Sequence, residues 1–329
     1  MQKKATKTEP WDLKSVLLHK IKERGGYINC HAHLDRAFTI TLKKLDMANH
    51  LMERKWELVD EMKKKSSEED YYHRIVQGLD LMVAQGVTAT CSFIDIDPVS
   101  EFRAIKAAVR AKKEYAKKID FRIINQTLKG VLDKKAREYI EKSLDYVDII
   151  GGLPSKDRPY PDKHLDYLFG IARETGKMVH MHIDQENNPK ERDTELLLQK
   201  VIEHNLQGKV VAVHAISLAA QPPAYRKMLL PLLKAAGITI VVCPSAAVNM
   251  KEVPFKSHVH KPIAPVVDLM QHGVNVALGV DNIMDIYEPF IDGDMWFETR
   301  LLMEVSRYYD LDKVADIATV NGKKALGIT

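Results

Sequence analysis

The chain has 329 residues, of which 45% are apolar and 29% charged, and this composition is typical of a folded globular protein and excludes a disordered one. The formal net charge of +4 is small, and basic patches interleaved with aromatic residues are missing, so nucleic acid is not an expected partner. No run approaches the ~18 apolar residues needed to cross a bilayer, and residues 1–11 lack the apolar core of a secretory signal. Cys30, Cys91 and Cys243 each lie in an apolar run, which favours reduced thiols in a cytoplasmic protein over disulfides.

After a first helix at residues 12–23, short runs rich in valine and isoleucine alternate with longer amphipathic segments. This alternation is typical of βα units and a parallel sheet. Eight strands are predicted, at residues 27–34, 87–94, 120–128, 147–152, 178–183, 209–214, 238–243 and 275–280. Helices are predicted between them at residues 67–85, 99–117, 134–144, 162–175, 191–205, 223–236 and 262–272.

Four of the predicted helices stop at a glycine that precedes a strand, where a left-handed C-terminal cap belongs: Gly86, Gly176, Gly237 and Gly273. Strict alternation of eight strands with helices predicts an α/β fold, a closed (β/α)8 TIM-type barrel, rather than an open sheet. No G-x-G-x-x-G motif follows a strand, so a dinucleotide site is not indicated.

Two further helical stretches lie outside this count. Residues 47–64 form a charged insertion after the first strand, interpreted as a lid at the barrel mouth, and residues 312–326 form a last helix. No linker of low complexity marks a boundary, so residues 1–329 are interpreted as one domain. Its barrel proper spans 27–329, and 1–26 form an N-terminal helical extension.

Polar residues that bind metals stand at the ends of several predicted strands. His31 and His33 end the first strand, and their i, i+2 spacing places both side chains on one face. His182 ends the fifth strand, His214 ends the sixth, and Asp281 follows the eighth. Because the carboxyl ends of barrel strands share one face, we expect these side chains to converge. Imidazole and carboxylate ligands suit one divalent metal ion, zinc or ferrous iron, better than calcium.

Other histidines of the chain are not predicted to bind a metal. His180 lies on the same strand face as His182 and illustrates a histidine that only packs in a core. The pair His258 and His260 lies among proline and lysine without strand character and is interpreted as loop.

An ordered set of motifs resembles the metal-dependent amidohydrolase superfamily, and within it the cytosine deaminase-like branch. The resemblance runs from about residue 27 to the C-terminus. The matching segments are 31–35 (HAHLD), 147–154 (VDIIGGLP), 179–184 (VHMHID), 213–214 (VH), 279–285 (GVDNIMD), 293–295 (GDM) and 318–327 (ATVNGKKALG). Relatives often carry a small β-sandwich, for which this chain has little room, so we expect the barrel to lack it.

The resemblance implies a role for each strand-end residue. His31, His33, His182 and Asp281 look like the four metal ligands, and His214 like the histidine that contacts the attacking water or the leaving side of the substrate. The fourth strand offers no lysine to bridge two metals, which favours a single ion. Water held by one cation has its pKa lowered from ~15.7 toward ~7. Asp281 would orient or deprotonate that water, and His214, if protonated, would stabilise an oxyanion.

The chain departs from the deaminase pattern after the fifth strand. Deaminases of this branch carry a glutamate proton shuttle where this chain has Gln185, and an amide cannot cycle a proton near neutral pH. Glu186 is adjacent, but a shift of one residue along an extended segment reverses its facing, so it replaces the acid only if the backbone kinks. For substrate binding, the resemblance suggests Gln126 for an amide edge, Asn282 beside the metal aspartate, and Tyr287 as an aromatic wall, although each also fits a purely structural role.

The leading hypothesis is a mononuclear metal-dependent hydrolase that cleaves a C–N bond of a small nitrogen heterocycle, by deamination or by amide or N-alkyl hydrolysis. The alternative is a catalytically silent barrel that binds a ligand or partner, which Gln185 motivates. A barrel enzyme with a phosphate site and no metal is the third and weakest reading, because no glycine-rich phosphate loop follows strands seven or eight. A small-molecule substrate is the expected partner, without nucleic acid or membrane. The oligomeric state stays open, with a homo-oligomer as one alternative.

Overall fold

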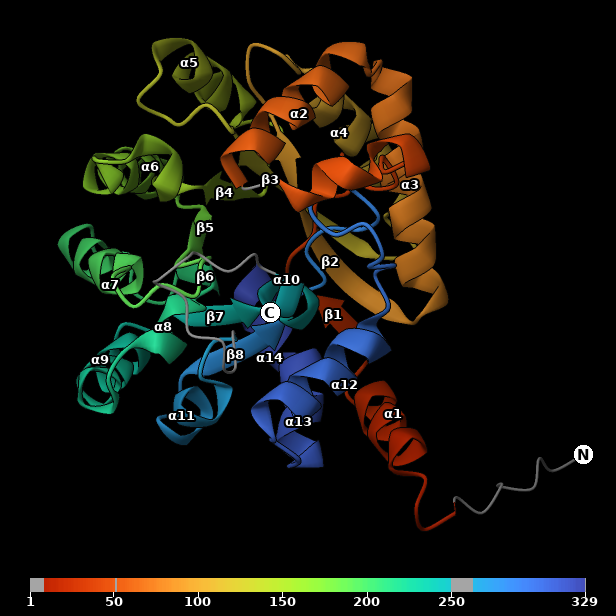
Figure 1. Ribbon diagram of the computed structural model, residues 1–329, viewed down its shortest axis with the longest axis vertical. Helices are drawn as coiled ribbons and strands as arrows, with labels where there is room; N and C mark the ends of the chain where they lie inside the picture. The colour runs from red at the N-terminus through yellow and green to blue at the C-terminus, as the bar shows by residue number, and fades with distance from the viewer. Residues whose placement is uncertain (1–8, 51, 250–262, 329) are drawn as a thin grey trace, which may run out of the picture.

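The computed structural model describes residues 9–50, 52–249 and 263–328. Eight parallel strands form one sheet in the order β1 to β8, and the helices surround it (Figure 1). The sheet closes where the Cys30 N–H donates to the Leu278 carbonyl over 2.9 Å and Ala32 pairs with Asp281. The predicted (β/α)8 barrel is therefore confirmed. The strands are β1 (Tyr27–Asn29), β2 (Val87–Asp95), β3 (Asp120–Gln126), β4 (Ile149–Gly152), β5 (Met178–Ile183), β6 (Val210–His214), β7 (Thr239–Val242) and β8 (Asn275–Leu278).

The helices follow the predicted alternation with shifts of a few residues at their ends. The α-helices are α1 (Leu13–Glu23), α2 (Met52–Lys65), α3 (Glu68–Ala84), α4 (Arg103–Tyr115), α5 (Lys134–Ser143), α6 (Pro161–Thr175), α7 (Asp193–Glu203), α8 (Ser217–Ala220), α9 (Pro223–Ala235), α10 (Pro244–Asn249), α11 (Val266–Gln271), α12 (Met295–Ser306), α13 (Leu311–Ala318) and α14 (Val320–Leu326). Two 3-10 helices are η1 (Leu42–Asn49) and η2 (Pro154–Asp157).

Three predicted elements differ from the structure. Strand β1 ends at Asn29 instead of reaching residue 34, so His31 and His33 follow the strand and only Ala32 pairs beyond it. The insertion begins earlier than residue 47 and is split into η1 and α2. The predicted last helix breaks into α13 and α14 at Thr319, whose hydroxyl donates to the Ala315 carbonyl and whose φ and ψ of −138° and −95° leave the helical region.

The glycine caps are confirmed. Gly86, Gly176, Gly237 and Gly273 have φ between 66° and 79°, the left-handed region that a glycine adopts without steric cost. Each therefore turns the chain from a helix into the following strand.

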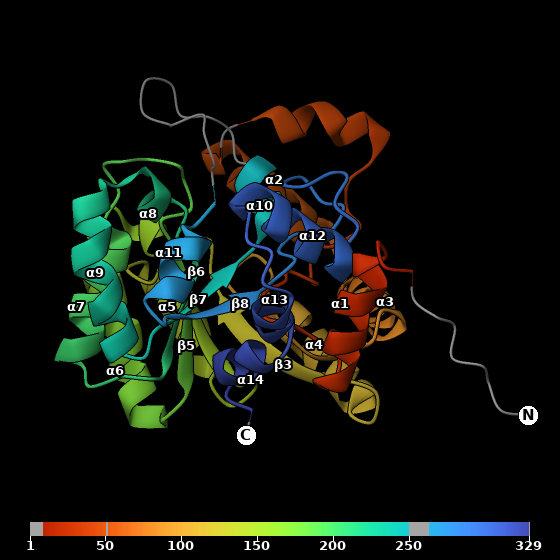
Figure 2. The same ribbon diagram turned by 90° about the horizontal axis from the view of Figure 1, so that it is seen from below.

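The end of the barrel opposite the strand carboxyl termini is closed by α14 (Figure 2). Ala325 and Leu326 pack with the inward-facing residues of the strands, and the Ala325 carbonyl lies 2.8 Å from the His180 Nε2 atom. Gly322 approaches the barrel so closely that a Cβ there would lie 2.6 Å from a side-chain carbon of Ile28. His180 is thus a core residue, as its sequence context suggested, and only the carboxyl end of the barrel is left for a site.

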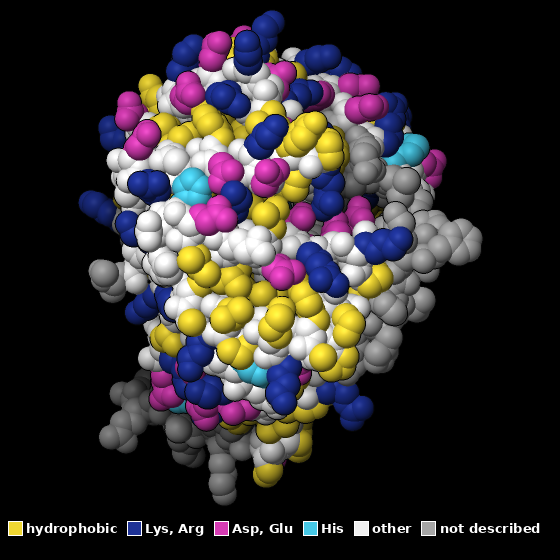
Figure 3. Space-filling view, turned by 90° about the vertical axis from the view of Figure 1, so that its left-hand side faces the viewer, with side chains coloured by type: hydrophobic (Ala, Val, Ile, Leu, Met, Phe, Trp, Pro, Cys, Tyr) yellow, Lys and Arg dark blue, Asp and Glu magenta, His cyan; other side chains and the backbone are white. Residues whose placement is uncertain are grey.

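The N-terminal helix α1 packs against α13 on the outside of the barrel. Arg24 bonds Asp312 over 2.8 Å and Asp316 over 2.9 Å, which ties the first helix to the penultimate one. Across the face seen in Figure 3, charges of both signs are interspersed with apolar side chains.

The parts of the chain that the structure describes contain no β-sandwich beside the barrel. Within the same residues, none of the helices is long and apolar enough to span a membrane. His258 and His260 lie outside the described residues, as does the start of the helix predicted at 262–272.

Candidate metal and active site

Four of the predicted ligands converge at the carboxyl end of the barrel. The Nε2 atoms of His31 and His33 lie 3.2 Å and 3.3 Å from the same Asp281 oxygen, Oδ1. The Nε2 atom of His182 lies 3.3 Å from that of His33. All four side chains are buried. Residues separated by up to 250 positions therefore meet in one compact cluster.

The closure of the barrel positions three of these ligands. The N–H groups of Val280 and Asp281 both donate to the His31 carbonyl over 3.0 Å, and the His33 N–H donates to the Asp281 carbonyl over 3.2 Å. Asp281 has φ +64° and His214 has φ +78°, a region that costs a residue with a side chain of order 1–3 kcal/mol. The fold thus holds strained backbone at two strand ends to aim these side chains.

The electrostatics of the cluster suit metal binding. Burial lowers the pKa of His182 well below its usual value, and burial together with the Arg36 charge does the same for His33, so both imidazoles are neutral with a free lone pair. Burial alone would raise the pKa of Asp281, but the adjacent imidazoles hold it well below its usual range. A carboxylate beside neutral imidazoles is the donor set that zinc and similar metals prefer.

The fit to a metal is supported by unsatisfied ring nitrogens. The Nδ1 atom of His31 is buried without a hydrogen-bond partner, its Nε2 atom lies 3.2 Å from Asp281 Oδ1, and the Nε2 atoms of His33 and His182 face each other. On the far side of its ring, the Nδ1 atom of His182 lies 3.2 Å from the Gly152 carbonyl, the outer contact that fixes the tautomer of a metal-binding histidine. The buried group of His31, His33 and His182 could therefore hold a metal ion.

A second group of potential ligand atoms was missed by the sequence reasoning. Cys243, just after β7, lies with His31 and Asp281 in a buried group of the same kind. Burial raises the pKa of Cys243 well above its usual value, so it is a neutral thiol and a poorer ligand than the imidazoles. The strand-end rule that selected the histidines also applied to Cys243, which was interpreted only as a core thiol.

His214 lies beside the ligand cluster, with its Nε2 atom 3.7 Å from Asp281 Oδ2. Burial lowers its pKa to about 4, so this histidine is neutral near pH 7. The protonated form considered from the sequence is therefore not the resting form. At 3.7 Å the imidazole and the carboxylate are too far apart for a hydrogen bond, and the neutral ring keeps one donor and one acceptor nitrogen.

The chain does kink after β5. Asp184 has φ +48°, and its carboxylate accepts hydrogen bonds from the N–H groups of Asp193 and Thr194 over 2.9 Å and 3.1 Å, which secures the start of α7. Gln185 and Glu186 follow this kink and are half-buried. Strand alternation therefore does not decide which of the two faces the site.

The residues suggested for substrate binding have different surroundings. Gln126 ends β3 and is buried with its Oε1 atom unpartnered, so an acceptor is left for a ligand. The side chain of Asn282 is engaged at both ends, because it donates to Asp281 Oδ1 over 2.9 Å and accepts from Arg36 Nε over 3.1 Å. Tyr287 is buried with an unpartnered hydroxyl, and its ring lies 4.9 Å from the Arg36 guanidinium carbon.

A buried acid behind the cluster provides a test of the electrostatics. Glu298 on α12 accepts the Ser245 N–H over 3.0 Å, and burial raises its pKa to about 8. The folded chain thus binds this proton more tightly than the unfolded chain, so the free energy of unfolding falls as pH rises from about 4.5 to about 8. We expect Glu298→Gln to match wild type in melting temperature near pH 5 and to exceed it at pH 8.5. Thermal unfolding of chelator-treated protein across this range measures the difference, and parallel curves would contradict the expectation.

Comparison with known proteins places the chain among hydrolases. The sequence profile described as "Amidohydrolase family" matches residues 25–329. An uncharacterized protein of Haemophilus influenzae is 40% identical over 265 residues, covering 78% of this chain and 95% of that protein. The N-isopropylammelide isopropyl amidohydrolase of Pseudomonas sp. strain ADP is 28% identical, covering 92% of this chain and 74% of its own length.

Solved structures show the same fold. The 5-methylcytosine deaminase of Klebsiella pneumoniae, solved with 5-fluorocytosine, superposes with a TM-score of 0.83 at 22% identity, over 92% of this chain and 74% of that one. The N-isopropylammelide isopropylaminohydrolase of Burkholderia multivorans superposes with a TM-score of 0.76 at 21% identity, with the same coverage.

Proposed function

The chain belongs to the amidohydrolase family, in its cytosine deaminase-like branch, and on that premise we propose that it is a mononuclear metal-dependent hydrolase. Its reaction is the hydrolysis of a C–N bond of a small nitrogen heterocycle, with release of ammonia or an amine. The observation that carries the proposal is the cluster of His31, His33, His182 and Asp281, whose atoms lie 3.2–3.3 Å apart at the barrel mouth. The names of the relatives support the bond type and the heterocyclic substrate.

Each residue of the cluster has a proposed task. His31, His33, His182 and the Oδ1 atom of Asp281 would hold one divalent ion, zinc or ferrous iron. Such an ion supplies Lewis acidity that makes water nucleophilic at neutral pH. Asp281 is ionised, and its second oxygen, Oδ2, which lies 3.7 Å from His214 Nε2, would take a proton from the attacking water. His214 would orient that carboxylate or hydrogen-bond the reacting group.

The amide of Gln126 would bind the ring of the substrate. Its buried Oε1 atom lacks a partner, and a ring N–H of an amidine or amide supplies the missing donor. Asn282 contributes through Asp281, whose Oδ1 atom it fixes by a hydrogen bond, and Tyr287 closes the site on the side of Arg36.

The roles of Gln185 and Glu186 distinguish a mechanism in which Asp281 alone transfers protons from one in which a second residue after β5 also does. If Asp281 alone cycles the proton, Gln185→Ala lowers kcat/KM by less than about 10-fold, well short of the ~10²–10⁴ that a positioned proton carrier contributes. Glu186→Gln tests in the same assay whether Glu186 carries a proton, because activity falls only if its carboxylate takes part in the reaction. We expect Gln185→Ala to retain activity, because its amide cannot exchange protons.

The experiment measures ammonia and alkylamine release by metal-reconstituted protein on cytosine, related cyclic amidines and N-alkylamino-triazines, for wild type, Gln185→Ala and Gln185→Glu. Turnover by wild type that His182→Ala abolishes supports the hydrolase. Turnover by Gln185→Glu alone would mean that the natural chain has lost its proton carrier. If wild type and Gln185→Glu both bind these heterocycles but neither turns them over, the chain is instead a catalytically silent barrel that binds a ligand.

A further inference from the structure

The side chain of Asn282 is held between a buried cation and the proposed metal-binding carboxylate. Its Nδ2 group donates to Asp281 Oδ1 over 2.9 Å, and its Oδ1 atom accepts from Arg36 Nε over 3.1 Å. Its backbone N–H donates to Glu288 Oε2 over 3.0 Å. An amide has a donor end and an acceptor end, so turning it over would place donor against donor and acceptor against acceptor. Asn282 therefore keeps one orientation as long as both of its side-chain partners stay in place.

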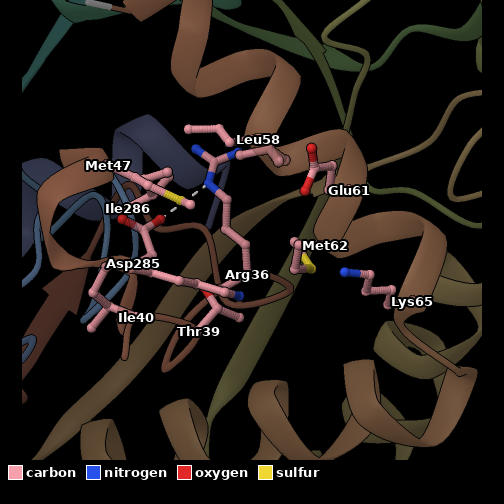
Figure 4. A pocket seen from close by; sticks show the side chains of 12 residues that line it. Arg36, Thr39, Ile40, Met47, Leu58, Glu61, Met62, Lys65, Asp285 and Ile286 are labelled. Atoms are coloured by element: carbon pink, nitrogen blue, oxygen red, sulfur yellow. Dashed lines mark hydrogen bonds and ion pairs between the residues drawn. The ribbon is translucent and has the colours of Figure 1, made fainter. Parts of the chain in front are cut away.

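Arg36 is itself fixed in the turn that follows the first two proposed ligands. Its backbone N–H donates to the His33 carbonyl over 3.4 Å. Its side chain is buried, with Nε 3.4 Å from Asp285 Oδ2 and the guanidinium carbon 4.9 Å from the ring of Tyr287. The guanidinium is turned toward Asp285 (Figure 4). The buried carboxylate compensates the charge, and the Nε–H group is thereby held where it reaches Asn282.

The two oxygens of the Asp281 carboxylate have different surroundings. Oδ1 lies 2.9 Å from Asn282 Nδ2, and it lies 3.2 Å and 3.3 Å from the Nε2 atoms of His31 and His33. Oδ2 lies 3.7 Å from His214 Nε2, too far for a hydrogen bond. Rotation about the last bond of an aspartate side chain is soft and exchanges the two oxygens. The hydrogen bond from Asn282 opposes this rotation, because it ties Oδ1 to a fixed donor.

We propose that Arg36 is a positioning residue for the reaction, which acts through Asn282 to fix the rotation of the Asp281 carboxylate. Oδ1 then faces the other proposed metal ligands, and Oδ2 keeps the place from which it takes a proton. The inference rests on the proposed function for the role of Asp281. It adds to that function a residue outside the ligand cluster. Outer partners of this kind contribute about 10- to 100-fold to metal affinity or activity.

Lysine at position 36 separates the hydrogen bond from the charge. A lysine side chain has a CH₂ group where arginine has Nε, so Arg36→Lys removes the donor to Asn282 and keeps a cation near Asp285. Asn282→Ala removes the link to Asp281 itself. If Arg36 acts through Asn282, adding Arg36→Lys to Asn282→Ala changes nothing further. If Arg36 only stabilises the fold, the effects of the two substitutions multiply.

The first readout is the affinity of the full chain for Zn²⁺, measured by competition with a fluorescent chelator, because it requires no substrate. The second is kcat and KM for release of ammonia or amine by the zinc-loaded protein. The matched control is Arg74→Lys, which removes an Nε–H bond of 2.7 Å to the Asp35 carbonyl in the same turn. Circular dichroism shows that each variant is folded. Should Arg36→Lys misfold, Arg36→Met combined with Asp285→Asn removes the cation and its carboxylate together and takes its place.

We expect Arg36→Lys and Asn282→Ala each to weaken zinc binding by about 10-fold or more, and the double variant to match Asn282→Ala within about twofold. Arg74→Lys is expected to bind zinc as wild type does. In turnover, kcat is expected to fall while KM stays unchanged, because a displaced base affects the transition state.

Three results would overturn the inference: effects of Arg36→Lys and Asn282→Ala that multiply, an equal loss of zinc affinity in Arg74→Lys, or unchanged zinc affinity in Arg36→Lys. A rise of KM without a fall of kcat would also contradict it. The expected pattern of zinc affinities without release of ammonia or amine would refute only the hydrolase. A wild type that binds no zinc would refute the metal site and this inference together.

Discussion

Asp281→Ala is expected to abolish both metal binding and turnover. Asp281 Oδ1 is the atom on which His31 and His33 converge, and Oδ2 is the proposed proton acceptor, so one substitution removes a ligand and a base. Loss of a base alone costs about 10²–10⁴ in rate, and loss of the ion adds to this, so kcat/KM should fall by about 10³ or more. Elemental analysis of dialysed protein and steady-state amine release measure the two effects.

Two controls make this result specific. Asp292→Ala removes an exposed carboxylate from the same loop and should leave metal content and rate unchanged. His182→Ala should lower metal content as Asp281→Ala does, because it removes a different ligand of the same cluster. Retention of a full equivalent of metal and of turnover by Asp281→Ala would place the active centre elsewhere.

Of the substitutions considered, Lys63→Met is expected to lower the free energy of unfolding most. Burial disfavours the charge of Lys63, but Asp95 and Asp97 hold its pKa above the usual value, so the ammonium is fully paired. Methionine has a similar shape but leaves the buried Asp97 without its cation and Asp95 with Arg36 at 3.9 Å as its remaining one. Breaking a buried pair in this way costs about 3–5 kcal/mol. Urea unfolding followed by circular dichroism measures the change in the free energy of unfolding.

The matched control for this substitution is Lys64→Met, which removes a neighbouring exposed lysine and should change stability by less than about 0.5 kcal/mol. Adding Asp97→Asn to Lys63→Met should restore part of the loss, because one uncompensated charge disappears. If only α2 detaches, trypsin will cleave within residues 54–65 of Lys63→Met before global unfolding. Equal stability of the Lys63 and Lys64 variants would show that the buried pairs do not fasten the insertion.

Much of the architecture could be predicted because short segments of the sequence have patterns that determine their own secondary structure. Apolar runs of strand length, amphipathic helices and four glycine caps repeat along the chain, and each repeat forms one βα unit. Parallel strands in a barrel end at the same edge, so a polar residue at a strand end is placed near other strand ends without further information. This is why His31, His33, His182, His214 and Asp281 could be grouped before the structure was known.

Other features depend on contacts between distant segments, which local periodicity does not encode. The pairing of Lys63 with Asp95 and Asp97 joins an insertion to a strand about 30 residues away, and no spacing rule connects them. The break at Thr319 follows from the need to turn α14 under the barrel, where Ala325 meets His180. The engagement of Asn282 between Arg36 and Asp281, and the kink at Asp184 before Gln185, likewise exist only in the folded chain.

The residues proposed to bind a metal could thus be predicted from the sequence alone, because barrel topology places residues at the ends of different strands close together in space. The apolar cluster between α2 and the barrel mouth could not be predicted in this way. Its members come from α2 and from the segments after β3, β4 and β8, and they become neighbours only when Val59, Leu128, Leu153 and Tyr287 are buried together. Hydrophobic burial is non-directional and leaves no motif in the sequence, so the tertiary structure alone decided which apolar side chains form that cluster.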